Sequence, residues 1–354
     1  MRSPNNSGIK FEYYLNGRHF SYPDFVLKDK AERIQKEIQK GVNVKKYIAL
    51  RLLSTIPIVL VTSFVIFVLL RVCGSDPVAS YLLNSQLPAT PEIITQLRTE
   101  FGLDKPILEQ YVAWLGGAIK LDFGVSYMSG REVASDFAEF LPVSAALIAC
   151  GLGIVCLGSV VLGILSARFA NTALDFIIRA FCFIGVSMPN FWLAFLLMLL
   201  FSLHLGWLAP LGLEEGARSF ILPAISISLM SLCINTRLVR ANMLEVAKER
   251  HILYARLRGL PSGVITVKHI FYNASLPIIT AMGMHLGELL GAALVVENIY
   301  ALPGIGLYAI QAIANHDYPV IECFFVLMCV VFVLSNAIID IIYALLDPRL
   351  ARER

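Results

Sequence analysis

The feature that most constrains this chain is a series of apolar runs, each long enough to cross a lipid bilayer as a helix. The hydrocarbon core of a membrane excludes open sheet edges and irregular backbone, because their polar groups find no hydrogen-bond partners there. The composition agrees, since 57% of the 354 residues are hydrophobic, against about 45–50% in soluble domains. We therefore expect an all-α integral membrane protein.

Six of these runs qualify as transmembrane helices. They cover approximately residues 51–70, 143–168, 176–205, 221–239, 278–296 and 323–346. Glycines recur along the second run, which predicts close packing against another helix; they are Gly151, Gly153, Gly158 and Gly163. Pro189 interrupts the third run and predicts either a kink or an interfacial segment followed by the span proper.

The basic residues indicate how the spans are oriented. Lys and Arg are absent from residues 298–322, whereas they accumulate in residues 243–277 and near both ends of the chain. By the positive-inside bias, both termini and residues 243–277 are expected on the cytoplasmic side. The polar first 20 residues predict no cleavable signal peptide. The net charge of only +3 gives no indication of a nucleic-acid partner, and none is expected.

The chain outside the spans falls into four parts. Residues 1–46 form a charged cytoplasmic extension, in which residues 29–40 are either a surface helix or a disordered tail, and residues 350–354 are a short cytoplasmic tail. Residues 72–141 are too long and too polar for a simple connector, so they predict a small extracytoplasmic subdomain. Within it, Thr90 as N-cap and Pro91 at the first helical position begin a helix that ends at Gly102.

The fourth part is the polar, basic segment 243–277, which lies between two apolar runs. Good helix formers fill residues 243–258, Gly259 stands where a left-handed cap is needed, and Pro261 prevents continuation. A second short helix over residues 264–273 then leads back to the membrane at Pro277. This helix-turn-helix carries an apolar stripe that needs a partner; the stripe is Leu253, Leu257 and Leu260.

The segment resembles the cytoplasmic coupling loop of ABC importer permeases, although the signature glutamate of that loop is absent here. Further landmarks, VSMPNFW, VVENIYALPGIG, HDYPV and YALLDPR, occur in the order and spacing of the oligopeptide, dipeptide and nickel importer permeases. DFGVS and SGREV also follow in the family's order. Residues 47–349 thus resemble the transmembrane domain of that family. The resemblance implies that this domain includes a cytoplasmic coupling helix.

The resemblance implies a multi-pass permease subunit of the bacterial cytoplasmic (inner) membrane, working by alternating access. Its partners would be a homologous second permease, two ABC ATPase subunits and an extracytoplasmic solute-binding protein. The chain contains no G-x-x-x-x-G-K-[ST] motif, so it is expected to be a transport subunit and not an enzyme. ATP and Mg would bind to the partner ATPases, and no cofactor or metal site is expected in this chain. Di- or oligopeptides are the leading cargo, and nickel or a metallophore is the alternative.

The resemblance also assigns candidate site residues. Contact with the ATPase is assigned to Leu253, Tyr254, Ala255, Arg256, Leu257, Arg258 and Gly259. Arg256 and Arg258 either pair with acidic groups there or are simply solvated.

The fifth span supplies the candidates for the translocation path, which are His285, Glu288 and Glu297. A charge at the centre of a span costs about 2.5–3.5 kcal/mol, so Glu288 is not expected to face lipid. His285 and Glu288 share one helical face. There they would meet the cationic end of a peptide, give a metal chelate transient ligands, or simply contact the partner subunit.

Two other classes of function use the same residues. An ion-coupled secondary transporter would need intramembrane acids, for which Glu288, Glu297 and Asp340 qualify. An intramembrane hydrolase would need a nucleophile with a base, or paired metal ligands, and His285 with Glu288 is the one such pair in the spans. Neither class requires the ordered landmarks of the coupling loop.

Overall fold

The computed structural model describes residues 12–15, 18–21, 44–73, 76–85 and 88–346. The chain divides into two compact units, Met1–Arg51 with Ala344–Arg354, and Leu52–Tyr343. In the first unit, strands β1 (Glu12–Leu15) and β2 (Arg18–Ser21) form an antiparallel hairpin. The predictions for residues 29–40 and for the tail 350–354 fall outside the described residues.

The second unit is helical and carries the membrane spans. Five helices are long and apolar enough to cross a bilayer, and a bent pair makes a sixth when it is counted as one span. The five are Leu53–Val72 within α2 (Val44–Cys73), α6 (Val133–Arg168), Gly216–Val246 formed by η2 (Gly216–Phe220) and α9 (Ile221–Val246), Pro277–Ile299 within α12 (Tyr272–Ile299), and Tyr318–Ile339 within α14 (Tyr318–Leu346). The predicted six-span helical fold is confirmed when the bent pair is included.

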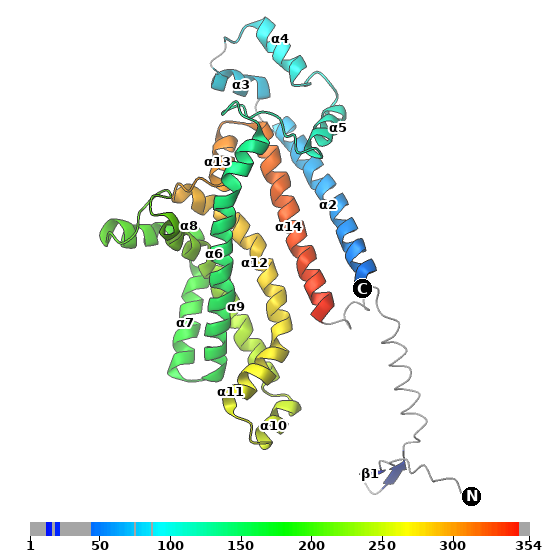
Figure 1. The fold of residues 1–354 in the computed structure, drawn as a ribbon, viewed down its shortest axis with the longest axis vertical. Helices are drawn as coiled ribbons and strands as arrows, with labels where there is room; N and C mark the ends of the chain where they lie inside the picture. Colours follow the sequence, from blue (N-terminus) through cyan, green and yellow to red (C-terminus); the bar gives the residue numbers. More distant parts are fainter. Residues whose placement is uncertain (1–11, 16–17, 22–43, 74–75, 86–87, 347–354) are drawn as a thin grey trace, which may run out of the picture. The chain divides into compact units, whose positions relative to one another are not determined.

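The bent pair is the predicted third span. Helix α7 (Ala173–Ser187) is followed by α8 (Asn190–Leu197) and the π-helix η1 (Met198–His204), and the two halves meet at 106°. Met188 is extended and Pro189 is the N-cap of α8, because a proline disfavours helical backbone in the residue before it. The run is thus sharply broken at Pro189, and the interfacial segment followed by a span proper stays a prediction. In Figure 1, α8 leaves the bundle sideways from the top of α7.

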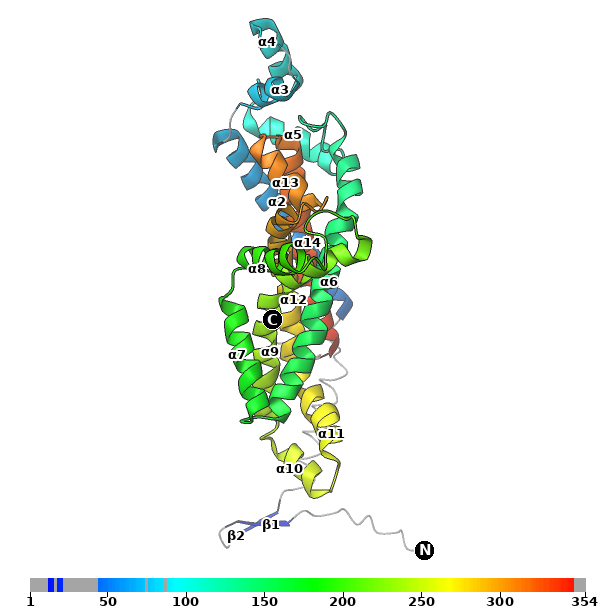
Figure 2. The same cartoon turned by 90° about the vertical axis from the view of Figure 1, so that its left-hand side faces the viewer.

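Helix α9 is the centre of the bundle, in contact with α6, α7, α8 and α12 (Figures 1 and 2). The glycines of α6 allow the closest approach. A Cβ atom added to Gly151, Gly158 or Gly163 would lie 2.5–2.7 Å from side chains of α9. The predicted close packing is therefore confirmed at these three positions, whereas Gly153 faces open space.

We call the predicted extracytoplasmic subdomain, residues 72–141, the outer loop. It contains α3 (Pro77–Ser85), α4 (Pro91–Glu100) and α5 (Ile107–Ala118). The predicted N-cap is confirmed, since the Thr90 side chain accepts a hydrogen bond from the backbone N–H of Ile93. Gly102 has φ +65° and ends α4 as predicted. The last residues of the predicted 72–141 subdomain are already helical, because α6 begins at Val133. Its first turns are held by burial against α13 (Ile305–Ala314), with Val133 and Phe137 in their common core.

The inner loop differs from its prediction in two places. Helix α9 ends at Val246 and a separate helix, α10 (Arg250–Leu257), follows after a short break, where one continuous helix was expected. After the turn, α11 (Ser262–Val264) runs through the π-helix η3 (Ile265–Phe271) directly into α12, so the predicted end of the second short helix at Asn273 is wrong. The helix survives the proline because Ala274 and Ile278 are buried on either side of it.

Candidate functional site

Helix α10 is anchored to the bundle by its buried side. Ile252 and Ala255 pack among Val239 and Met243 of α9 and residues of η3 and α12. We call this set the inner cluster; it consists of Val239, Met243, Val246, Ile252, Ala255, Ile265, Ile270, Ala274 and Ile278. Because α10 has only eight residues, this burial holds it in place more than its own helical hydrogen bonds do.

The end of α10 is fixed by Gly259. Its φ of +74° confirms the predicted left-handed cap. The Gly259 N–H donates to the Arg256 carbonyl at 2.9 Å, and the Leu260 N–H donates to the Ala255 carbonyl at 3.4 Å. These two bonds are the Schellman pattern, which satisfies the last helical carbonyls and turns the chain sharply. The cap thus sets the direction in which α10 presents its outer face.

The outer face of α10 is apolar and uncovered. Leu253 is 56% exposed and Leu257 is 74% exposed, with Tyr254 and Leu260 beside them. We call these four residues the coupling surface. Arg256 and Arg258 are exposed at its edges and make no ion pair within the described residues. In Figure 1 this loop lies at the end of the bundle opposite to α3 and α4. Such a face on an anchored helix is suited to docking another protein.

A buried ion pair ties α7 to α9 near the same end. The Asp175 carboxylate is fully buried and accepts two hydrogen bonds of 2.8 Å from the Arg240 guanidinium. It also accepts from the Ser166 hydroxyl and from the backbone N–H of Asn171. Sequence reasoning missed this ion pair, because its two members lie 65 residues apart.

The predicted polar pair of the fifth span does form, but its two members differ in exposure. The Glu288 carboxylate is 2.8 Å from His285 Nδ1 and accepts a 2.7 Å hydrogen bond from the Ser231 hydroxyl of α9. The side chain of Glu288 is 50% exposed, whereas that of His285 is 4% exposed. Glu288 is therefore the group presented at the surface of the chain, and His285 with Ser231 holds it in place.

The structure places Glu297 differently from the other two candidates for the translocation path. Its side chain has no exposed surface. One carboxylate oxygen accepts from the backbone N–H groups of Gly306 and Leu307, at 2.7 and 3.3 Å, in the first turn of α13. An oxygen at this place accepts from N–H groups that have no partner within the helix. Glu297 is thus a structural residue of the ALPGIG turn. The side chain of Asp340 lies outside the described residues.

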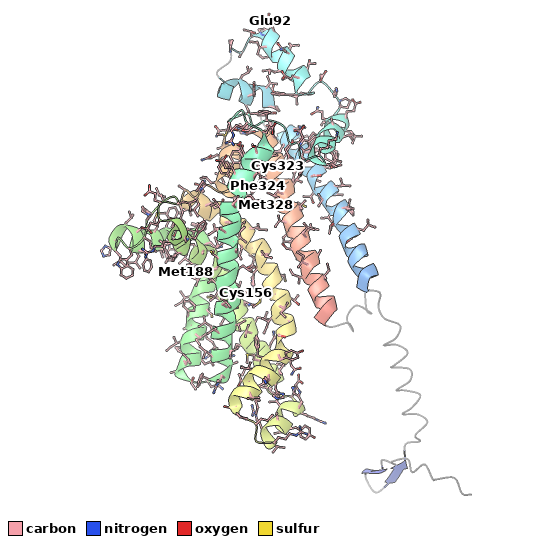
Figure 3. All side chains as sticks on the ribbon, in the orientation of Figure 1. Glu92, Cys156, Met188, Cys323, Phe324 and Met328 are labelled. Carbon is pink, nitrogen blue, oxygen red and sulfur yellow. The ribbon has the colours of Figure 1, made fainter. Side chains whose placement is uncertain are left out.

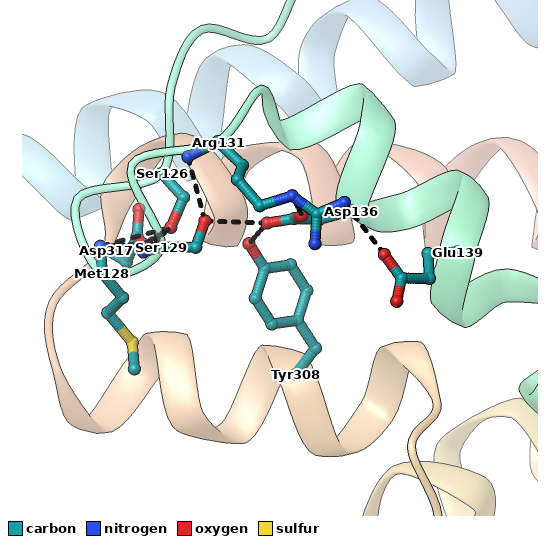
Figure 4. Close-up of polar contacts among 8 residues, drawn as sticks. All are labelled: Ser126, Met128, Ser129, Arg131, Asp136, Glu139, Tyr308 and Asp317. Carbon is teal, nitrogen blue, oxygen red and sulfur yellow. Dashed lines mark hydrogen bonds and ion pairs between the residues drawn. The ribbon is translucent and has the colours of Figure 1, made fainter.

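On the outer side, Asp317 fixes the loop to the start of α14. Its carboxylate accepts from the Ser126 hydroxyl at 2.6 Å and from the Met128 N–H at 3.1 Å (Figure 4). Burial raises the pKa of Asp317, and the hydrogen bond from Ser126 opposes that shift. Both partners of this contact belong to the sequence landmarks DFGVS and HDYPV, so the landmarks are explained in part by one anchoring contact.

A second group of polar contacts joins the same loop to α6 and α13. The buried Asp136 carboxylate accepts from the Tyr308 hydroxyl at 2.7 Å and from the Ser129 hydroxyl at 2.9 Å (Figure 4). Arg131 lies 3.2 Å from Asp136 and 2.9 Å from Glu139. Burial and the neighbouring Asp136 raise the pKa of Tyr308, so its hydroxyl remains a donor. Sequence reasoning recognised the SGREV landmark but not these contacts.

An apolar groove of about 630 Å³ runs between α2, α12 and α14. Phe324 and Met328 of α14, labelled in Figure 3, lie in it together with Leu290 of α12 and Ile66 of α2. Glycines Gly287 and Gly291 form part of its floor. The α2 span beside it is mostly uncovered in the single chain. This side of the bundle therefore offers a second apolar surface for a partner.

Comparison of the sequence with known families gives two matches. The family described as binding-protein-dependent transport system inner membrane component matches residues 159–352. The N-terminal part of the same kind of membrane component matches residues 44–148. Together the two matches cover nearly all of the described helical unit.

Individual relatives match over most of their length. A Brucella suis protein that carries the name of a peptide transport system permease is 33% identical over 309 residues, 84% of this chain and 96% of the relative. The metal-staphylopine import system permease protein CntB of Staphylococcus aureus is 33% identical over 306 residues, 86% and 98% of the two chains. The glutathione transport system permease protein GsiC of Escherichia coli is 31% identical over 303 residues, 85% and 97%.

Among solved structures, the chain resembles the MetNI methionine ABC transporter in an inward-facing conformation. The TM-score is 0.52 at 17% identity, over 60% of this chain and 96% of the solved chain. At this identity the likeness concerns the fold alone.

Proposed function

This chain belongs to the family of binding-protein-dependent transport system inner membrane components, the permease subunits of ABC importers, and we propose that it forms half of a membrane path for peptides. It is a multi-pass protein of the inner membrane, as its family and its apolar helices require. Because the chain belongs to this family, we prefer an ABC importer permease to the two other functions considered from the sequence. These were an ion-coupled secondary transporter and an intramembrane hydrolase. Both termini are proposed to face the cytoplasm, because the basic inner loop does so by the positive-inside bias.

The observation that carries the proposed mechanism is the coupling surface on α10. An apolar face that is more than half exposed, on a helix anchored by the inner cluster, needs a protein partner. We assign it to one of two ABC ATPase subunits, which would bind ATP and Mg and move α10 as they close. Arg256 and Arg258 at the edges would contact acidic groups of that subunit. The bundle would then rock between inward and outward openings.

Other surfaces suit the remaining partners. The apolar groove between α2, α12 and α14 is proposed to contact the homologous second permease, because it is apolar and open along the membrane-spanning length. The outer loop, held by Asp317 and Asp136, is proposed to dock the solute-binding protein. Its helix α4 presents Thr95 and Arg98 as exposed residues for that contact.

The cargo proposal rests on Glu288. A half-exposed carboxylate in the middle of a span is costly in lipid, so it is best explained by a polar path between the two permeases. There it would attract the cationic amino end of a peptide. Relatives named for peptide and glutathione transport agree with this cargo. A metal complex is the second candidate, supported by the relative named for metal-staphylopine import and by the His285–Glu288 pair.

Transport by the reconstituted importer tests both parts of the proposal. Uptake of a labelled dipeptide, a labelled oligopeptide and a nickel chelate is compared for the unchanged chain and for Glu288→Gln. Glu214→Gln, which removes an exposed carboxylate outside the membrane spans and outside the outer loop, is the charge-matched control. Loss of peptide uptake in Glu288→Gln alone supports the peptide path, and selective loss of chelate uptake supports the metal complex. Unchanged uptake of all three cargoes would remove Glu288 from the path.

A further inference from the structure

A groove of about 830 Å³ opens between α7 and α9, near the inner end of the bundle. The groove shares no lining residue with the coupling surface, and none with the contact between Glu288, His285 and Ser231. Its lining combines guanidinium groups with large apolar side chains; these are Phe176, Arg179, Phe183, Ile234, Arg237 and Arg240. A groove with both characters is unusual for a surface that faces lipid, where arginine is rare.

Each wall of the groove is one face of one helix. The wall on α7 consists of Phe176, Arg179 and Phe183, at spacings of three and four residues. The wall on α9 includes Ile234 and Arg237, three residues apart. Helix α7 begins at the inner end and α9 finishes there. Phe183 and Ile234 therefore lie deeper in the membrane than the arginines, and Phe183 is 72% exposed. The groove thus changes from basic to apolar with depth, as a phospholipid changes from head group to acyl chain.

The arginines of the groove are only partly neutralised within the chain. Arg240 is paired with the buried Asp175 at 2.8 Å, and Arg179 lies 3.7 Å from the same carboxylate. Arg237 makes no hydrogen bond or ion pair within the described part of the chain. One carboxylate therefore pairs with two of the three guanidinium groups, and the groove keeps an excess positive charge.

From this arrangement we propose that the groove binds one anionic phospholipid of the inner leaflet. Its phosphate lies between Arg179 and Arg237, and its acyl chains follow Phe183 and Ile234. Basic pockets between transmembrane helices on the cytoplasmic side bind such head groups. Arg237 lies nine residues before the end of α9, a distance of about 14 Å along the helix axis, so its long side chain extends toward the interface. The inference uses the orientation proposed above, but not the proposed cargo.

The charge of the groove decides the class of lipid. A zwitterionic lipid carries a compensating ammonium and leaves the excess charge of the groove in place, whereas a phosphate diester with an uncharged head neutralises it. Inorganic phosphate would match the arginines but leave the exposed apolar wall uncovered. Phosphatidylglycerol is therefore the probe that fits both ends of the groove.

Native mass spectrometry of the complete importer, released from detergent with added phosphatidylglycerol, tests the proposal. The unchanged importer is expected to retain one phosphatidylglycerol for each copy of this chain. Arg237→Gln is expected to weaken retention of the lipid roughly five-fold, because one guanidinium near an anionic lipid contributes about that factor. The double variant Arg179→Gln with Arg237→Gln should weaken retention more strongly. Arg237→Lys should retain most of the binding. The matched control is Arg168→Gln, which removes an exposed arginine at the inner end of α6, outside the groove.

A second measurement places the lipid. Phosphatidylglycerol with a photoreactive acyl chain is expected to label peptides that contain Phe183 or Ile234, and excess inorganic phosphate should not reduce the labelling. Equal retention of phosphatidylcholine would overturn the proposal, as would equal losses in Arg168→Gln and Arg237→Gln. Labelling spread evenly over α2 and α14 would also overturn it, since that indicates bulk lipid. Crosslinks from this groove to a partner subunit would assign it to that protein instead. None of these readouts depends on transport.

Discussion

Replacement of Gly259 by valine is expected to disconnect transport from ATP hydrolysis while the membrane domain stays folded. Gly259 has φ +74°, a backbone region that costs a residue with a Cβ about 1–2 kcal/mol. A Cβ atom added there meets nothing within 4 Å. The whole cost is therefore local backbone strain, with no clash against the rest of the bundle.

That strain is comparable to what holds α10 in place. Burial of Ile252 contributes about 1.5–3 kcal/mol, and the methyl group of Ala255 adds about 0.8 kcal/mol. A penalty of about 1–2 kcal/mol lowers the population of the native cap by roughly 5- to 30-fold relative to its alternatives. This penalty is small against the burial that holds the membrane-spanning helices together. We therefore expect a displaced coupling surface on an intact bundle.

Proteoliposomes that contain the complete importer provide the assay. For Gly259→Val, substrate uptake and the stimulation of ATP hydrolysis by loaded binding protein should both fall, while the amount of assembled membrane domain stays constant. Gly259→Asn should be milder, because asparagine tolerates left-handed backbone. Gly263→Val is the matched control, since Gly263 has no positive φ and an added Cβ has free space. Full uptake by Gly259→Val, or an equal loss in Gly263→Val, would refute the reasoning.

Three further predictions concern the buried polar contacts. Arg240→Gln leaves the Asp175 carboxylate buried without its partner and should cost about 3–5 kcal/mol of stability, which the double variant with Asp175→Asn should largely restore; thermal unfolding in detergent measures both. Glu297→Ala leaves the buried N–H group of Gly306 without an acceptor, at about 1–3 kcal/mol, and the partly buried N–H group of Leu307 at less, whereas Glu297→Gln should restore most of the melting temperature. Because the pKa of Asp317 is raised in the folded state, that state holds the proton to higher pH than the unfolded chain. The stability of the unchanged protein relative to Asp317→Asn should therefore be greatest below about pH 4 and fall as pH rises through the raised pKa. Asp104→Asn, an exposed carboxylate of the same loop, should show no such trend.

The features that the sequence predicted correctly are those whose cause is local. Thr90 and Pro91 begin a helix, and Gly102 and Gly259 end one, because capping depends on residues within one turn. The glycines of α6 were also informative, since only small residues allow a helix to approach so closely.

The features that the sequence could not predict depend on partners far along the chain. Glu297 resembles an acid in a translocation path until α13 folds back and places its first N–H groups on the carboxylate. The early start of α6 at Val133 depends on burial against α13, more than 170 residues later. The helix through Pro277 depends on the inner cluster. In each case tertiary contacts outweighed a local pattern that indicated a loop, a break or an exposed site.

Helix α9 connects the two regions that we propose to act in transport. Its inner end supplies Val239 and Met243 to the inner cluster, on which α10 and the coupling surface rest. Ser231, two to three turns earlier on the same helix, donates to the Glu288 carboxylate at 2.7 Å. A rotation or shift of α9 therefore changes the support of α10 and the position of Glu288 together, because a packed helix moves as one body. The hydrogen bond from Ser231 makes that relation specific, since it ties the exposed carboxylate to α9 instead of leaving it to follow α12 alone. The proposed ATPase contact on the coupling surface and the proposed cargo contact at Glu288 would therefore be linked through one shared helix.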